Sequence, residues 1–397
     1  MNDIDHERCL ALAVDLAATP SVSSNEGDAV RLVAEAMGSF GFDEIDIDHS
    51  GNVCGIIHPP DATGPRPGRA LLIDGHIDTI PLHSPDAWSV DPFGGVVAGG
   101  RLYGLGICDQ KASIAAAVAG VAAARRHLQG PVAVVASVAE EHMEGAALRG
   151  VIERFRPDAV ITSEPTDTRL AVGQRGRAKA WARIVGRACH AGHRSAGINA
   201  VEALADLLIE LRALEHPTHP NLGRRDLTVI DAHSSPYPSV STVPGEVLAR
   251  FDCRFPPGES PDSVVALLTA AAARAWAGWP EPPQLQAGLV QATFETWTGA
   301  RFSVDEFAAA WWTDPDGPLV GAAARALGTV GLDPTPTTYA FCTNGSLTAG
   351  LLGLPTIGFG VGEEPTSHQV DEHVTLASLR RGAEGFAALA AHLTGHW

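Results

Sequence analysis

Short apolar runs that alternate with helical patterns constrain this sequence more than any other feature. Strand-type runs occupy residues 52–57, 70–74, 132–138 and 159–162, and an alanine-rich helical stretch at 112–124 separates the second run from the third. Short apolar runs are typical of strands buried on both faces, and strand–helix alternation is typical of layered α/β folds. We therefore predict an α/β domain whose mixed sheet is flanked by helices.

The pattern changes near residue 173. The following segment predicts strands and helices at 179–185, 199–214, 227–231, 247–255 and 261–277. A second α/β stretch begins near residue 296, so we expect an inserted α+β domain at 173–295 between two parts of one α/β domain, 1–172 and 296–397. An inserted domain of this kind closes over a site as a lid or dimerises beside it.

The charge balance excludes several classes of partner. Lys and Arg number 28 against 46 Asp and Glu, which gives a formal charge of −18. Such a chain repels phosphate backbones and anionic lipid, so we expect no nucleic-acid and no membrane partner. The apolar stretch 112–124 is too short to span a bilayer. Six cysteines without a CxxC pair, and an N-terminus without a secretory pattern, predict a cytoplasmic protein.

One apolar run ends in two residues that can do chemistry. His76 and Asp78 stand two residues apart after residues 70–74, so both side chains leave the same face of an extended chain. An imidazole can bind a metal ion while a neighbouring carboxylate fixes its ring. Because such a pair by itself is more often an ordinary surface turn, the interpretation depends on further residues.

Further candidates follow other predicted elements. Asp109 precedes the alanine-rich helix, and Glu164 follows the fourth run. Glu140 and Glu141 follow the third run, where neighbouring side chains point to opposite sides, so that one can bind a metal while the other acts as a base. The alternatives are a helix cap for Asp109 and a solvated pair for the two glutamates. His368 lies in a polar loop near the C-terminus.

These candidates are expected to meet in space. The carboxyl ends of strands in an open α/β sheet lie at one edge, where sites assemble. Nitrogen and oxygen donors without a thiolate suit zinc, cobalt or manganese. The sequence therefore predicts a site for a pair of divalent metal ions.

Five motifs in this order resemble those of the M20 family of metallo-aminoacylases and peptidases, which includes acetylornithine deacetylase, succinyl-diaminopimelate desuccinylase and carboxypeptidase G2. The motifs are GHIDTIP at 75–81, YGLGICDQK at 103–111, EE at 140–141, SEPT at 163–166 and SHQ at 367–369. The resemblance covers essentially the whole chain. It implies a zinc-peptidase-like catalytic domain with a dinuclear metal site, and a smaller lid or dimerisation domain.

The resemblance also assigns the metal ligands, which are His76, Asp109, Glu141, Glu164 and His368. It implies that His76 and Glu164 hold one ion, that Glu141 and His368 hold the other, and that Asp109 bridges the two. Zinc is the expected metal, and cobalt and manganese accept the same ligands.

Two further residues receive catalytic roles from the resemblance. Glu140 is implied as the general base that takes a proton from the attacking water and then returns it to the leaving amine. Asp78 is implied to orient His76. The expected reaction is hydrolysis of an amide bond.

The predicted inserted domain carries a second set of similar positions. His190 resembles the family's histidine that reaches the site of the neighbouring subunit and donates a hydrogen bond to the oxyanion; the alternative is a packed histidine. Arg175 and Arg254 resemble positions that hold a substrate carboxylate, although Arg254 could instead pair with Asp252. Asn344 stands at a substrate-binding position where family members often have Asp.

These inferences lead to a functional prediction. We expect a dinuclear metal-dependent hydrolase that deacylates an N-acyl amino acid or a related carboxylate-bearing amide, acting as a homodimer through the inserted domain. A dipeptidase or carboxypeptidase of the same family is the first alternative, because it shares every metal residue. A non-catalytic binding relative is the second, and the intact Glu140 argues against it because a binding protein needs no base.

Overall fold

The computed structural model describes residues 4–60 and 68–397, which form two compact units. Unit 1 contains the residues up to Gln174 together with Thr293–Phe302 and Trp311–Trp397. Unit 2 contains Arg175–Ala292 and Ser303–Ala310. Compared with the expected inserted domain at 173–295, unit 2 therefore also takes in Ser303–Ala310.

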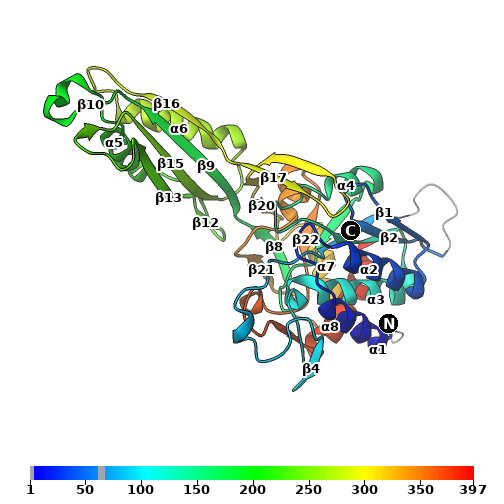
Figure 1. The fold of residues 1–397 in the computed structure, drawn as a ribbon. Coiled ribbons are helices and arrows are strands. Elements are labelled where there is room, and N and C mark those ends of the chain that lie inside the picture. The colour runs from blue at the N-terminus through cyan, green and yellow to red at the C-terminus, as the bar shows by residue number, and fades with distance from the viewer. Residues whose placement is uncertain (1–3, 61–67) are drawn as a thin grey trace. The chain divides into compact units, whose positions relative to one another are not determined.

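Unit 1 is built on a mixed sheet, as predicted (Figure 1). The described residues give it nine strands, β1 (Glu44–Ile47), β2 (Val53–Ile57), β6 (Val132–Ser137), β3 (Leu71–His76), β7 (Ala159–Thr162), β22 (Thr356–Gly358), β8 (Leu170–Gln174) and β20 (Trp311–Trp312) in spatial order, with β21 (Pro336–Tyr339) beside β8. Strand β3 runs parallel to both β6 and β7, and β22 runs parallel to β7. The carboxyl ends of these four strands consequently lie at one edge of the sheet.

Helices cover both faces of this sheet. The larger set consists of α1 (His6–Ala18), α2 (Gly27–Phe40), α3 (Ala112–Ala124), α7 (Pro318–Thr329) and α8 (Leu376–Leu393). Leu71 and Ile73 of β3 pack into the same apolar cluster as these helices, whereas Leu72 packs into a cluster that includes α4 (Arg149–Phe155). Successive strand residues point to opposite faces, so a fully apolar strand is what burial on both faces requires.

The alanine-rich helix α3 lies at the centre of unit 1 and packs closely on α8. A methyl group added at Gly120 would come within 2.4 Å of the Ala383 carbonyl oxygen, so this approach depends on the missing side chain. The stretch Ile107–His127 is the one helical stretch in the described residues that is long and apolar enough to cross a membrane, and 83% of its most apolar window is buried inside the protein. The structure therefore uses it as a core helix.

Unit 2 is an antiparallel sheet with helices on one face. In spatial order its strands are β13 (Asp226–Ser235), β15 (Glu246–Phe255), β9 (Gly176–Val185) and β16 (Gln284–Leu289), with β19 (Phe307–Ala308) also beside β9. Helices α5 (Ala200–Ala213) and α6 (Pro261–Ala275) share an apolar core with β9 and β15. Asn199 caps α5, and Ser260 and Ser263 form a capping box at α6, as the residue types at these positions favour.

Small elements complete the described chain. The short strands are β4 (Val96–Ala98), β5 (Arg101–Tyr103), β23 (His373–Thr375), β10 (Cys189–His190), β14 (Thr242–Val243), β11 (Thr218–His219), β12 (Gly223–Arg224), β17 (Gln291–Glu295) and β18 (Arg301–Asp305). The short helical turns are η1 (Pro85–Ala87), η2 (Ile107–Lys111), η3 (Arg125–His127), η4 (Ala191–Ala196), η5 (Ser346–Leu351) and η6 (Glu364–Thr366).

Candidate metal centre

The carboxyl edge of the unit 1 sheet carries most of the predicted site residues. His76 is the last residue of β3, Glu140 and Glu141 follow β6, and Glu164 follows β7 by two residues. Because β3, β6 and β7 are parallel neighbours, their ends deliver these side chains to the same place. Asp109 reaches this edge from η2, directly before α3.

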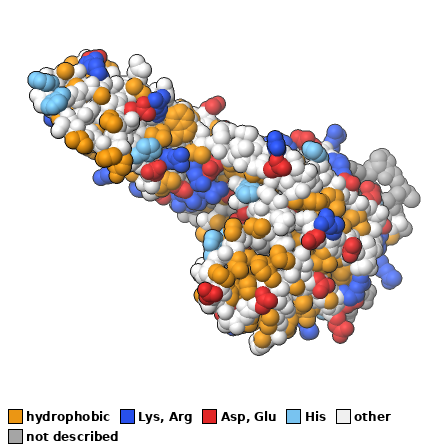
Figure 2. Space-filling model, viewed as in Figure 1, with side chains coloured by type: hydrophobic (Ala, Val, Ile, Leu, Met, Phe, Trp, Pro, Cys, Tyr) orange, Lys and Arg blue, Asp and Glu red, His pale blue; other side chains and the backbone are white. Residues whose placement is uncertain are grey.

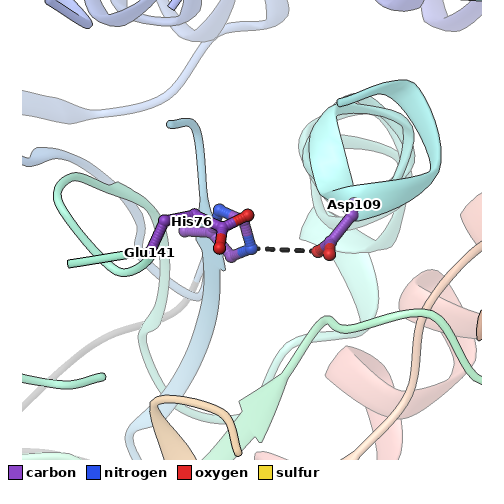
Figure 3. A group of neighbouring side chains, drawn as sticks. All are labelled: His76, Asp109 and Glu141. Carbon is purple, nitrogen blue, oxygen red and sulfur yellow. Dashed lines mark hydrogen bonds and ion pairs between the residues drawn. The ribbon is translucent and has the colours of Figure 1, made fainter. Parts of the chain in front are cut away.

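Asp109 lies between two histidines. His76 Nε2 is 3.0 Å from Asp109 Oδ1, and His368 Nε2 is 3.2 Å from Asp109 Oδ2. Figure 3 shows the Asp109 carboxylate directed at the His76 ring, with Glu141 beside that ring. One ligand atom from each of His76, Asp109 and Glu141 lies within 4.8 Å of the others.

Each histidine also lies near a glutamate, and Glu141 is near both rings. His76 Nε2 is 3.9 Å from Glu164 Oε1, and His368 Nε2 is 2.8 Å from Glu141 Oε1. The Oδ1 side of Asp109 thus faces His76 and Glu164, whereas the Oδ2 side faces His368 and Glu141. The structure brings all five predicted ligands together in two overlapping groups that share one carboxylate.

The donor set fits divalent metal ions. Ligand atoms about 2.0–2.1 Å from a tetrahedral zinc are separated by roughly 3.3 Å, and the separations here are similar, from 2.8 to 3.9 Å. Glu164 Oε2 and Glu140 Oε1 are buried and have no hydrogen-bond partner among the described residues. Such oxygens are costly to bury unless a cation or a donor meets them.

Asp78 contacts three of the site residues from within the core. It is fully buried, and it accepts hydrogen bonds from the Ser23 hydroxyl and from the backbone N–H groups of Glu140 and Glu141. His76 Nδ1 lies 3.0 Å from the Asp78 carbonyl oxygen and 3.5 Å from its Oδ1. Since both atoms can only accept, Nδ1 carries the hydrogen, which leaves Nε2 as the atom directed at Asp109.

The electrostatics follow from burial and from these contacts. Burial raises the pKa of Glu140 well above its usual range, and it does the same for Glu164. Burial acts to lower the pKa of His76, but its hydrogen bond to Asp109 and other nearby carboxylates raise that pKa overall. Hydrogen bonds to Asp109 and Glu141 raise the pKa of His368 to about 10. For Asp109, burial opposes the shift, and the two histidines lower its pKa.

The predicted substrate-binding residues have partners of their own. Arg254 forms the ion pair with Asp252 that the sequence left open, with Nε 2.7 Å from Oδ1. Arg175 Nη2 donates to Asp226 Oδ2 at 3.0 Å and to the Arg224 carbonyl oxygen. Their contact with a substrate stays a prediction.

Asn344 and His190 lie in different units. Asn344 is buried in unit 1, where its amide group donates to Asp74 and Ser137 and its oxygen accepts from the Gly145 N–H. These contacts make it a core residue, and its predicted contact with substrate is untested. His190 ends β10 in unit 2, and its Nδ1 accepts a hydrogen bond from the Gly192 N–H at 3.0 Å.

Sequence reasoning missed two buried glutamates near the site. Glu26 accepts hydrogen bonds from the backbone N–H groups of Ser24 and Ala139, the residue directly before Glu140. Glu372 accepts three backbone N–H groups around Asp109. An acidic residue next to an apolar element was the available signal in both cases, but such residues are usually exposed.

The layered fold and this buried carboxylate–imidazole cluster are those of a metal-dependent amidohydrolase, and sequence comparison supports that class. A sequence model described as peptidase family M20/M25/M40 matches residues 72–392. This chain belongs to that family. The predicted fold class and enzyme class are thereby confirmed.

The relatives span nearly the whole chain. The uncharacterised protein YgeY of Escherichia coli is 30% identical over 94% of this chain and 92% of its own length. A succinyl-diaminopimelate desuccinylase of Cereibacter sphaeroides is 29% identical over 93% of this chain and 94% of its own length.

Solved structures share the fold at lower identity. The aminopeptidase PepT of Bacillus cereus has a TM-score of 0.76 at 16% identity, covering 98% of this chain and 99% of that one. The YXEP protein of Bacillus subtilis, described as a dinuclear metal-binding peptidase of the M20 family, has a TM-score of 0.71 at 16% identity and covers 98% of each chain.

Proposed function

We propose that this protein is a dinuclear metal-dependent deacylase that hydrolyses the amide bond of an N-acyl amino acid or a related carboxylate-bearing amide. One observation carries the proposal. The two oxygens of Asp109 face two separate histidine–glutamate pairs, His76 with Glu164 and His368 with Glu141. A carboxylate shared in this way can bridge two ions. The dinuclear description of the YXEP protein supports this reading.

When bound, two divalent ions polarise the substrate carbonyl and lower the pKa of an attacking water. Glu140 is the proton carrier in this proposal, because its Oε1 is buried beside the metal ligands without a partner among the described residues. Burial raises the pKa of Glu140 above its usual range, and a carboxyl group with a raised pKa is suited to carry a proton from water to the leaving amine. Asp78 fixes the Glu140 backbone and therefore the direction of that carboxylate.

Two observations support the proposed class of substrate: a group of arginine side chains and the similarity to a desuccinylase. Lys and Arg side chains gather near β12 in unit 2, where Arg224 and Arg175 meet (Figure 2). Arginine is the usual donor to a carboxylate. The similarity to a succinyl-diaminopimelate desuccinylase, by name an enzyme that removes a carboxylate-bearing acyl group, supports the same class.

The proposed homodimer uses unit 2. Strand β13 lies at the edge of its sheet and, among the described residues, pairs only with β15. Ile230 on this strand is 55% exposed. A ten-residue edge strand that is paired on one side only and carries exposed apolar side chains can pair with a second copy. We expect Ile230→Lys to give a monomer by sedimentation, whereas Val97→Lys, a similarly exposed residue of unit 1, leaves the dimer intact.

The deciding assay is a substrate panel. N-acetyl, N-succinyl, N-formyl and N-carbamoyl amino acids are tested beside dipeptides, each with zinc, cobalt and manganese. Release of an amino acid from an N-acyl substrate, lost in Glu140→Gln with the metal retained, supports the proposal. Turnover of dipeptides alone makes the protein a peptidase, and no turnover with any metal makes it a binding protein. Loss of metal in Glu140→Gln would mean that Glu140 and Glu141 have exchanged roles.

A further inference from the structure

Two loops carry two of the ligands for the ion on the His368 side. The first, Gly106–Asp109, ends in Asp109, and the second, 362–372, contains His368. Neither His368 nor Asp109 lies in a strand of the main sheet. By contrast, His76 belongs to β3 and Glu164 follows β7 by two residues, so the sheet fixes the backbone that carries those two ligands.

Glu372 of the second loop holds the first loop by hydrogen bonds. This carboxylate is 1% exposed. Its Oε1 accepts the backbone N–H groups of Cys108 at 2.8 Å and Asp109 at 3.1 Å, and its Oε2 accepts that of Gly106 at 3.0 Å. Because both of its oxygens accept backbone N–H groups, one side chain fixes three backbone groups of the loop that holds Asp109.

Cys108 of the first loop forms hydrogen bonds with the second loop. Its thiol donates to the Glu363 carbonyl oxygen at 3.4 Å, and its sulfur accepts from the hydroxyls of Thr366 at 3.0 Å and Ser367 at 3.5 Å. The fit is close, because a methyl group at Gly362 would come within 2.6 Å of this sulfur. The sulfur therefore lies inside the turn that immediately precedes His368.

We propose that Glu372 and Cys108 form a reciprocal clasp that fixes the spacing of Asp109 and His368, and that this clasp sets the affinity for the second metal ion more strongly than that for the first, which shares only Asp109 with the two loops. The inference rests on the proposed dinuclear function. The 3.2 Å separation between Asp109 Oδ2 and His368 Nε2 is the quantity that the clasp holds. The side chain of His368 is 42% exposed, so its position depends on the backbone of its loop and on its contacts with Asp109 and Glu141.

Both residues are positioning residues, because neither contacts the reacting atoms. Supporting contacts behind metal ligands typically change metal affinity by about 10–100-fold when they are removed. In Glu372→Gln, an amide NH2 replaces one acceptor oxygen and faces a backbone N–H group. In Cys108→Ala, the contacts with the second loop are lost. We expect the affinity for the second zinc ion to fall at least about tenfold in each variant, and the affinity for the first to fall by less.

The test is a zinc titration of chelator-treated full-length protein, read by competition with a chromophoric chelator and by native mass spectrometry. Cys253→Ala is the matched control for a buried cysteine, and Asp48→Asn is the control for a carboxylate that accepts backbone N–H groups at a turn. Both controls should retain two tight ions.

The outcomes separate the clasp from the proposed function. If the parent protein binds a single ion, the dinuclear proposal itself fails. If the parent binds two ions and the Glu372 and Cys108 variants do so with unchanged affinities, or if both sites weaken equally, only the clasp is refuted. If Glu372→Gln does not fold, the Cys108→Ala titration decides alone.

Discussion

Replacing Asp78 tests how the site is supported. In Asp78→Asn one oxygen remains to accept the Glu140 N–H, while the amide NH2 takes the place of the oxygen that faces the Glu141 N–H and the Ser23 hydroxyl. Ser23 can turn and accept a hydrogen bond instead. The Glu141 N–H cannot, so this variant leaves one buried donor without an acceptor.

The expected loss of stability and of metal affinity follows from these contacts. A buried donor that loses its acceptor costs about 1–3 kcal/mol, so we expect Asp78→Asn to lower the free energy of unfolding by about that amount. Asp78→Ala leaves the N–H groups of both Glu140 and Glu141 without their acceptor, which doubles the expected loss to about 2–6 kcal/mol. Metal affinity should fall by about 10–100-fold in Asp78→Ala, because His76 loses the carboxylate oxygen that lies 3.5 Å from its Nδ1. Asp78→Asn keeps that oxygen, so its metal affinity should fall by less.

Urea denaturation of the metal-free protein measures the first effect, and chelator competition measures the second. The reasoning predicts that Asp78→Ala is more destabilised than Asp78→Asn. A change of less than about 0.5 kcal/mol in both variants, which is the range of neutral surface substitutions, would refute the claim that Asp78 supports the site.

Three further predictions follow. His190→Ala should greatly reduce turnover while dimerisation and zinc content persist; unchanged turnover would leave His190 a packing residue. Folding raises the pKa of Glu164, and it raises the pKa of His368 to about 10. The folded, metal-free protein therefore binds more protons than the unfolded chain between about pH 5 and 9. Its free energy of unfolding should fall as the pH rises through this range. Zinc should reverse this trend, since it binds the deprotonated ligands; a metal-free protein that is equally stable at pH 6 and pH 9 would contradict the argument. Gly120→Ala should destabilise unit 1 by about 1–3 kcal/mol because the new methyl group meets the backbone of α8. The control Gly328→Ala should not destabilise it, because no heavy atom lies within 4 Å of the new group. Equal denaturation midpoints for the two variants would refute the packing argument.

Local sequence patterns predicted those helices and strands whose residues carry a distinct composition. The alanine-rich run predicted helix α3 at the bounds observed, and the run at 159–162 matched β7. Strand ends predicted the convergence of His76 and Glu164 because parallel strands share an edge regardless of sequence distance.

Other features depend on contacts that no local pattern records. Ser24 and Asn25 are of residue types that favour helix caps, but Glu26 takes the cap position of α2, and its carboxylate accepts the Ser24 and Ala139 N–H groups. Strand β1 and helix α4 were not predicted. Strand β1 is exposed along its whole length, so it lacks the apolar run by which the buried strands were recognised.

The same limit applies to site residues. Asn344 was matched to a substrate-binding position by its loop, but its partners in the core come from three distant segments. Glu372 was visible in the sequence only as an acid near His368. Its role depends on backbone N–H groups more than 260 residues earlier in the chain, which only the folded structure brings together.

The central claim is that one carboxylate joins two metal sites. Anomalous diffraction from crystals grown with zinc tests it directly. Two peaks are expected roughly 3.5–4 Å apart on either side of Asp109, one against His76 and Glu164 and the other against His368 and Glu141. A single peak, or two peaks that do not share Asp109, would contradict it.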